Sequence, residues 1–238
     1  MTASRNLPSA LLDTYLAPSQ AFAALRERPA WSWAALALVI AVTVASLYTL
    51  YAGMSHEWIV EQQLAGMPDM PADQLAAARA QVAAVAPYSA HLGAIMVTLM
   101  MPLACLVFGF AYFLGERLLS RERNSFGRWF AAAAFGQLPM VINALGLIAL
   151  VLVRGGGNLP LDLGNYASLN NLVFGIPNGE NGYALASFAN LFYLWSIFLV
   201  AVAARVWSGL GWGKALLLAA LPSLLIYLPW LAIVLAQG

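Results

Sequence analysis

Five long apolar stretches decide what this chain can fold into. They run over residues 31–52, 89–114, 128–153, 184–205 and 213–235. A hydrocarbon core is about 30 Å thick and a helix rises about 1.5 Å per residue, so each stretch is long enough to cross a membrane as a helix. A segment such as "AALALVIAVTVASL" is apolar on all sides, whereas a membrane β-barrel alternates apolar and polar residues. The sequence therefore predicts an all-α integral membrane protein with five transmembrane helices.

The composition agrees with a single membrane domain. Of the 238 residues, 62% are hydrophobic and 9% are charged, fewer charges than the surface of a soluble domain of this length needs. The first apolar stretch follows thirty residues and is longer than the core of a signal peptide, so it is expected to be a retained span. We expect residues 1–30 to form a cytoplasmic or interfacial segment. Residues 31–238 are expected to form one five-helix domain with outer loops at 53–88 and 154–183.

Basic residues are distributed unevenly between the loops. The amino-terminal segment and the loops after the second and fourth spans hold nine of the eleven Lys and Arg residues, with four acidic residues and a net charge of +5. The other two loops hold two arginines and six acidic residues, a net charge of −4. Because short basic loops stay cytoplasmic, the amino terminus is expected inside and the carboxyl terminus in the periplasm. Scarce lysine and abundant Ala, Leu and Trp are typical of a bacterial inner-membrane protein.

Segments outside the spans also carry helix signals. In "APSQAFAALRERPAW", Pro18 suits a first helical position and Phe22 and Leu25 share a face, which predicts a short interfacial helix before the first span. In the first outer loop, Ser55 can cap "HEWIVEQQL" and Pro71 opens "ADQLAAARAQVAAV". This loop is predicted to be helical. It either folds over the outer ends of the spans or forms a surface for a partner.

The second outer loop, residues 154–183, is rich in Gly, Asn and Pro, which favour turns. It nevertheless contains too many large apolar residues for a free loop. Either a re-entrant segment or a segment lying at the membrane interface would bury them. These residues are Leu159, Leu161, Leu163, Leu172, Val173, Phe174 and Ile176.

No pattern of catalytic, cofactor-binding or metal-binding residues is found. "HEW" at residues 56–58 begins like the helix of a zinc protease, but Val60 stands where the second histidine is needed and only His91 remains. "RGGGN" lacks the Lys and the Ser or Thr of a phosphate-binding loop. Ionisable residues, which ion-coupled transport usually requires inside the spans, occur only at the span ends. The chain is therefore expected to be no enzyme and to bind no cofactor.

Neutral polar residues do occur inside the last three spans. Counted from the predicted inner ends at 128, 205 and 213, Asn143 and Asn190 lie fifteen residues deep, Gln137 and Ser196 nine, and Ser223 ten. Residues at equal depth on neighbouring helices can share hydrogen bonds, each worth roughly 0.6 kcal/mol in a membrane. Two polar layers are therefore predicted, which either hold the helices together or line a permeation path.

The densest charge in the chain lies in "ERLLSRERNSFGRWF", residues 116–130. Its arginines outnumber Glu116 and Glu122, as expected for a cytoplasmic loop. The cluster is short and mixed with glutamate, which argues against a nucleic-acid site. Ion pairs within it, such as Glu122 with nearby arginines, would fold the hairpin onto the span ends. The arginines predicted to contact a protein partner are Arg117, Arg121, Arg123 and Arg128.

The order of motifs along the chain resembles that of a known family. A "P..AF..L...P" element comes first, and a basic hairpin ending in "SFGRWF" lies between the second and third spans. The third span contains "QLP", and "WSGLGWGKALLLAALP" leads into the fifth. This order is similar to that of the Yip family, the Ypt/Rab-interacting membrane proteins, in a compact bacterial form. The likeness extends over nearly the whole chain.

The resemblance implies a five-span protein that acts through partners and has no enzymatic activity. Eukaryotic members bind Rab GTPases, but only about thirty residues precede the first span here, which argues against GTPase binding. Some bacterial members accompany ABC-type exporters. The leading expectation is a lipid-embedded adaptor or accessory partner of another inner-membrane complex, or a homo-oligomer. The rival expectation is a small channel or transport subunit built around the polar layers.

Overall fold

The computed structural model describes residues 3–65, 67 and 71–237, and these residues are helical with no β-strand. Asp69, one of the acidic residues counted for the outer loops, lies outside them. Five segments are long and apolar enough to cross a membrane: Pro29–Tyr51, Ala72–Leu119, Phe126–Val153, Leu191–Ser208 and Trp212–Ala236. The prediction of an all-α chain with five candidate spans is confirmed. The side of the membrane on which each terminus lies stays a prediction.

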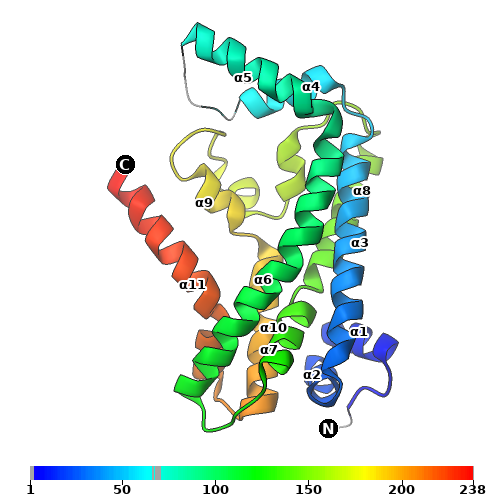
Figure 1. Ribbon diagram of the computed structural model, residues 1–238, viewed down its shortest axis with the longest axis vertical. Helices are drawn as coiled ribbons and strands as arrows, with labels where there is room; N and C mark the ends of the chain where they lie inside the picture. Colours follow the sequence, from blue (N-terminus) through cyan, green and yellow to red (C-terminus); the bar gives the residue numbers. More distant parts are fainter. Residues whose placement is uncertain (1–2, 66, 68–70, 238) are drawn as a thin grey trace. The chain divides into compact units, whose positions relative to one another are not determined.

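The helices follow one another along the chain as Figure 1 shows. The α-helices are α1 (Leu7–Leu16), α2 (Pro18–Glu27), α3 (Ser32–Tyr51), α4 (His56–Leu64), α5 (Ala72–Val85), α6 (Ser89–Leu119), α7 (Phe126–Gly136), α8 (Pro139–Val153), α9 (Tyr183–Phe188), α10 (Leu191–Ser208) and α11 (Trp212–Gln237). Short turns of other helix types are η1 (Pro29–Trp31), η2 (Ala86–Tyr88), η3 (Leu161–Asn165) and η4 (Asn170–Phe174).

The chain divides into two compact units, and the long helices contribute residues to both. Unit 1 comprises Met1–Ala41, Thr98–Ile142 and Phe192–Trp230, and unit 2 comprises Val42–Val97, Asn143–Leu191 and Leu231–Gly238. Each unit has its own hydrophobic core. The single domain expected for residues 31–238 stays a prediction.

Helix α7 forms the centre of unit 1. Every residue from Trp129 to Gly136 is buried, including the alanines at 131–134. Small residues let helix backbones approach closely, and a Cβ on Gly109 of α6 would lie only 2.9 Å from the Cα of Phe130. Glycine at 109 therefore permits the close packing of α6 on α7.

The third span is interrupted between α7 and α8. Pro139 has no N–H to donate to the carbonyl of Phe135, and the N–H of Leu138 donates to that carbonyl instead at 3.1 Å. The hydroxyl of Tyr15 in α1 donates to the Leu138 carbonyl at 2.6 Å. Burial raises the pKa of Tyr15 to about 12, so the phenol remains a donor at neutral pH. Helix α1, which was not predicted from the sequence, thus stabilises the break.

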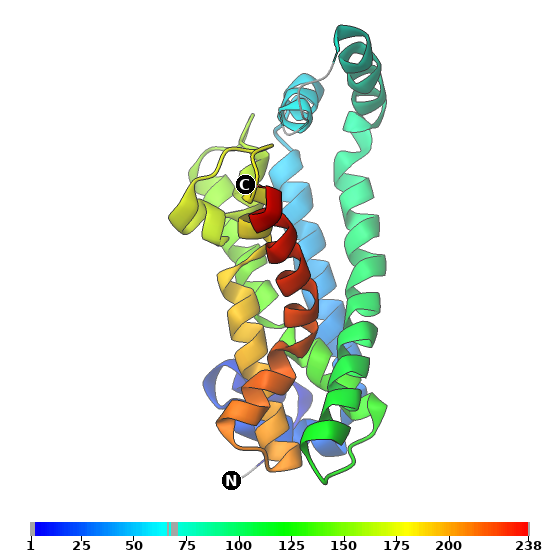
Figure 2. The same cartoon turned by 90° about the vertical axis from the view of Figure 1, so that its left-hand side faces the viewer.

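The amino-terminal helices pack in unit 1. Helix α2 begins at Pro18, as predicted, and its Phe22 and Leu25 are fully buried; its predicted interfacial position stays a prediction. Both views place α1 and α2 at the same end of unit 1 as the α6–α7 and α10–α11 connections (Figure 1, Figure 2). Two connections and the amino-terminal helices, all distant in sequence, therefore meet at one end of this unit.

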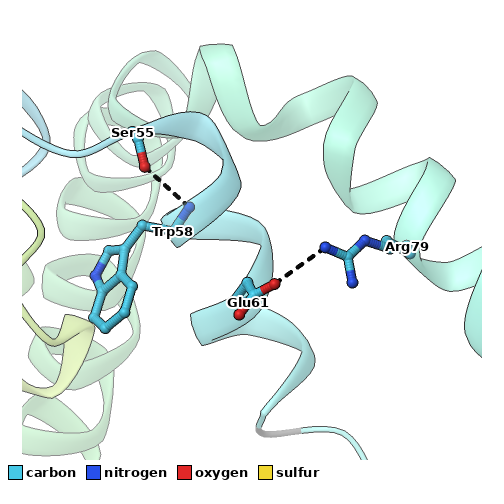
Figure 3. Close-up of polar contacts among 4 residues, drawn as sticks. All are labelled: Ser55, Trp58, Glu61 and Arg79. Carbon is cyan, nitrogen blue, oxygen red and sulfur yellow. Dashed lines mark hydrogen bonds and ion pairs between the residues drawn. The ribbon is translucent and has the colours of Figure 1, made fainter.

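The two predicted helices of the first outer loop are confirmed in unit 2. Ser55 caps α4 by accepting a hydrogen bond from the N–H of Trp58 at 3.2 Å (Figure 3). Helix α5 begins directly after Pro71. Glu61 of α4 and Arg79 of α5 form an ion pair at 3.1 Å (Figure 3), which is exposed and so contributes roughly 0.2–1 kcal/mol.

Helix α4 and helix α5 differ in how much they bury. Ile59 and Val60 of α4 are buried in the core of unit 2 with Leu50 of α3 and Val151 of α8. On α5, Val82 is buried, whereas most of the helix is exposed. Within unit 2, α4 therefore packs in one core with the ends of α3 and α8, whereas α5 keeps an exposed surface. The choice between the two alternatives for this loop stays a prediction.

The fourth span begins later than predicted. Helix α10 covers Leu191–Ser208 and not 184–205, because residues 183–188 form the separate helix α9. The peptide groups between the two helices bond to another segment: the N–H of Leu169 donates to the Ala189 carbonyl at 2.7 Å, and the N–H of Leu191 to the Ala167 carbonyl at 3.0 Å. These bonds take the backbone around Asn190 out of the helical pattern.

Candidate functional site

A buried carboxylate lies where the connections of unit 1 meet. Glu116, near the end of α6, is only 1% exposed. One carboxylate oxygen, Oε1, accepts hydrogen bonds from Asn124 Nδ2 at 2.6 Å and from the Ser208 hydroxyl. The other, Oε2, accepts from the Asn124 N–H at 3.0 Å and from Trp129 Nε1 at 2.9 Å. No Lys or Arg forms an ion pair with Glu116 among the described residues, so four donors alone compensate the burial of its charge.

The groups around Glu116 are tied in turn to α2. Arg128 Nη1 donates to Asn124 Oδ1 at 3.2 Å, and Arg128 Nε donates to the Arg26 carbonyl at 3.0 Å. Trp207 Nε1 donates to the Phe22 carbonyl at 2.7 Å. We call the set of Glu116, Asn124, Arg128, Trp129, Trp207 and Ser208 the carboxylate hub. Through it, the ends of α6 and α10, the start of α7, and α2 are hydrogen-bonded to one another.

Local sequence explains how these side chains are positioned. Ser125 caps α7 by accepting a hydrogen bond from the N–H of Arg128, which starts the helix so that Trp129, in its first turn, faces Glu116. Gly209 follows α10 with a φ of +62°, the left-handed conformation with which helices commonly end. The turn then continues into α11 and leaves the hydroxyl of Ser208 directed at the carboxylate.

The two tryptophans of the hub pack on each other, and one of them packs on Phe22 of α2. The ring centres of Trp129 and Trp207 lie 5.5 Å apart, and those of Phe22 and Trp207 lie 6.0 Å apart. Both pairs pack edge to face. Such pairs contribute about 0.5–1.5 kcal/mol beyond the area that they bury. Glu116, Trp129 and Trp207 are each at most 1% exposed, so water is excluded from the hub, which strengthens its hydrogen bonds.

The four predicted contact arginines lie in different settings. Arg128 belongs to the hub, and Arg117 places its guanidinium 3.8 Å from the ring centre of Phe113. Arg121 and Arg123 are exposed, and Arg123 donates only to the nearby main-chain carbonyls of Ser120 and Glu122. The ion pair expected for Glu122 is absent among the described residues. The hairpin is held instead by the hydrogen bonds to Glu116.

Three residues of the predicted polar layers line one small cavity in unit 1. Gln137, Ser196 and Ser223 share its wall with Tyr112 and other residues, and its volume is about 20 Å³, enough for roughly one water molecule. The hydroxyl of Ser196 donates to the Phe192 carbonyl of its own helix at 3.0 Å. The structure thus brings these three residues together around a cavity with room for roughly one water molecule.

Asn143 and Asn190 both lie in unit 2, in different settings. The main-chain carbonyl of Asn143 in α8 accepts a hydrogen bond from the Tyr166 hydroxyl at 3.2 Å, while its buried Oδ1 has no partner among the described residues. Asn190 is buried between α9 and α10, where it forms a backbone bridge with Ser168. Their predicted role as a shared layer stays a prediction.

Comparison with protein families decides the assignment of the chain. The model of the Yip1 domain family matches residues 12–233. The chain belongs to this family. No curated protein and no solved structure matched the chain. Every member of the carboxylate hub lies inside the matched range, so the hub is a feature of this Yip1 domain.

Of the six hub residues, only Arg128 was predicted as a site residue; the others are Glu116, Asn124, Trp129, Trp207 and Ser208. Trp129 lies in the motif "SFGRWF" and Trp207 and Ser208 in "WSGLGWG", the two segments on which the resemblance to the Yip family partly rested. The structure gives these motifs a physical role, because both supply donors to Glu116 or to its surroundings.

Proposed function

We propose that this Yip1-domain protein is a non-enzymatic adaptor of a bacterial inner membrane that docks on another membrane complex through the α6–α7 hairpin. An ABC-type exporter is one such complex. The observation that carries the proposal is the exposure of Arg121 and Arg123 on a hairpin whose backbone is anchored by a buried carboxylate.

Anchoring matters because a mobile loop loses entropy when it binds. Each rotamer-rich side chain that becomes fixed costs about 0.5–1.5 kcal/mol, and ordering the backbone adds to that cost. Here the main chain of Asn124 already donates to Glu116, and Ser120 donates to the carbonyl of Ser208 at 3.2 Å. A partner would therefore meet a hairpin that is held in place before binding.

The charge of this end of unit 1 suits an acidic partner. Arg121 and Arg123 form no ion pair among the described residues. Arg205 and Lys214 flank the neighbouring α10–α11 turn and are also exposed. Since a guanidinium can bind a carboxylate through two parallel hydrogen bonds, the expected partner surface carries Asp or Glu side chains. The charge bias between loops supports a cytoplasmic position for this surface.

The apolar helix faces support contact with lipid. In the spans that contain α6 and α11, only 11% and 17% of the most apolar 18-residue stretch is buried. Exposed apolar faces of this size are unfavourable in water and are expected to face acyl chains or another protein in the bilayer. A homo-oligomer would also cover them.

The rival proposal, a small channel or transport subunit, has weaker support. The cavity lined by Gln137, Ser196 and Ser223 holds roughly one water molecule. Purified protein in liposomes tests it: flux of an ion or small solute above that of empty liposomes would favour the rival over the adaptor.

We expect the double variant R121Q/R123Q to insert and fold normally but to lose a co-purifying membrane complex. Both side chains are exposed, so the apparent melting temperature should not change, whereas loss of two charge-assisted contacts should weaken binding by tenfold or more. The full chain is purified in a mild detergent, and its partner is quantified by mass spectrometry.

The control is R79Q/R154Q, which removes the same charge from exposed positions in unit 2. The adaptor proposal requires the partner to be lost from R121Q/R123Q and retained by R79Q/R154Q. Equal recovery from both variants would show that the hairpin arginines act only in membrane topology.

A further inference from the structure

The segment after α8 turns back along that helix in unit 2. Helix α8 ends at Val153, yet the hydroxyl of Tyr166 donates to the carbonyl of Asn143, ten residues earlier and about 15 Å along the helix axis. A Cβ on Gly146 would lie 2.2 Å from the Tyr166 hydroxyl oxygen, so the phenol packs directly on the helix. A tyrosine side chain is shorter than 15 Å, so the backbone at 166 also lies beside α8 and not beyond its end.

The short fourth span points the same way. Helix α10 has 18 residues and is about 27 Å long, whereas the hydrocarbon core is about 30 Å thick. The third span has 28 residues. The first N–H of α10 donates to the carbonyl of Ala167, so the segment around Ala167 lies beside the beginning of α10. The segment around Ala167 is therefore expected at the depth at which α10 begins.

Side chains of this segment satisfy part of its irregular backbone. The side-chain amide of Asn170 accepts a hydrogen bond from the N–H of Ile176 at 2.9 Å and donates one to the Ile176 carbonyl at 3.0 Å. Asn171 donates to the carbonyls of Asp162 at 3.0 Å and Asn165 at 2.8 Å. Irregular backbone is tolerated at membrane depth only where its polar groups find partners inside the protein, and these amides supply them.

The same segment exposes three consecutive apolar side chains. Leu172, Val173 and Phe174 in η4 are 56%, 68% and 59% exposed. Asp162, to which Asn171 is bonded, is also exposed and sets a limit on the depth, because a carboxylate deep in hydrocarbon is costly. A shallow position in the membrane satisfies both requirements. The apolar side chains of η4 would lie just below the lipid headgroups, and Asp162 would lie at the level of the headgroups.

We propose that residues 163–176 form a shallow re-entrant segment, and that Leu172, Val173 and Phe174 contact the acyl chains of the leaflet in which α8 ends. The surface binds lipid, and no soluble partner is needed to cover it. This function of the second outer loop is independent of the adaptor role of the α6–α7 hairpin.

Nitroxide labels in liposomes test the proposal. The single Cys105 is replaced by Ala, and one cysteine is introduced into the full chain by Val173→Cys, by Ile95→Cys on the exposed apolar face of α6, or by Arg154→Cys in the exposed turn after α8. Each labelled protein is placed in vesicles of phosphatidylcholine and phosphatidylglycerol. Collision rates of the label are measured with oxygen, which concentrates in the bilayer, and with a water-soluble nickel chelate.

The label at 173 is expected to favour oxygen, as the label at 95 does, while the label at 154 favours nickel. A preference for nickel at 173 would show an aqueous loop and overturn the proposal. Low collision rates with both reagents would show that another copy of the chain covers the site, which would also overturn it. Leu172→Cys provides a second label position if the variant at 173 does not fold.

Discussion

Glu116→Ala is expected to destabilise the Yip1 domain by about 3–5 kcal/mol, and to lower its apparent melting temperature by roughly 10 °C. The substitution removes the acceptor of four hydrogen bonds and leaves the donors of Asn124, Trp129 and Ser208 in a buried site. Buried donors without acceptors lose the hydration that they had in the unfolded chain. The loss should loosen the α6–α7 hairpin and the α10–α11 turn together.

Thermal unfolding of detergent-purified protein at a fixed scan rate measures this effect, because unfolding of such a chain is commonly irreversible. Glu122→Ala is the matched control: it removes the same side chain from an exposed position of the same hairpin and should change the melting temperature little. Glu116→Gln should fall between the two, since the amide keeps one acceptor oxygen but turns an NH₂ group toward donors. Equal melting of the Glu116→Ala and Glu122→Ala variants would rule out a stabilising hub.

Elements set by local sequence were the ones that could be predicted. The starts of α4 and α5 follow from a capping serine at 55 and a proline at 71, which act on their own helices. The five spans follow from length and hydropathy alone, because a lipid-exposed backbone must satisfy its own hydrogen bonds. These signals need no knowledge of the rest of the chain.

The partners of Glu116 could not be predicted because all of them lie beyond α6, the helix that carries Glu116. Asn124 is 8 residues away, Trp129 is 13 and Ser208 is 92. One local signal was available for the absence of an ion pair. On a helix, side chains three and four residues apart are neighbours, and the residues at those spacings after Glu116 are Leu119 and Ser120. A glutamate at the end of an apolar helix, with no basic residue three or four positions after it, is a candidate for a buried hydrogen-bonded carboxylate.

The start of α10 was misplaced for the same physical reason. The residues before it are apolar enough to continue a span, and no proline or glycine marks the break. The interruption depends on main-chain bonds to residues 167 and 169, which lie 24 and 20 positions before their partners in the chain. Hydropathy measures transfer into lipid and carries no information about such pairing.

Trp207→Ala is expected to cost about 3–5 kcal/mol and to detach the amino-terminal helices from the rest of unit 1. The indole is 1% exposed, and its Nε1 donates to the Phe22 carbonyl at 2.7 Å. Removing so large a buried side chain leaves a cavity as well as a lost bond. Trp207→Phe retains most of the ring contact and removes only the donor, so it should cost about 1–2 kcal/mol.

Limited trypsin digestion can separate detachment of α2 from general unfolding. The bond after Arg26 is protected while α2 is packed and the Arg26 carbonyl accepts from Arg128; in Trp207→Ala, cleavage there should precede cleavage in the α6–α7 hairpin. Trp212→Ala is the matched control, because that indole is 44% exposed and lies in the same motif. If α2 stays protected in Trp207→Ala, the contact between Trp207 and Phe22 is dispensable and the bond from Arg128 to the Arg26 carbonyl is enough to hold α2. Early cleavage after Arg26 with the hairpin intact would instead show two separable sets of contacts at the same end of unit 1. The polar contacts of Glu116 would hold the hairpin, and the contact of Trp207 with Phe22 would hold α2.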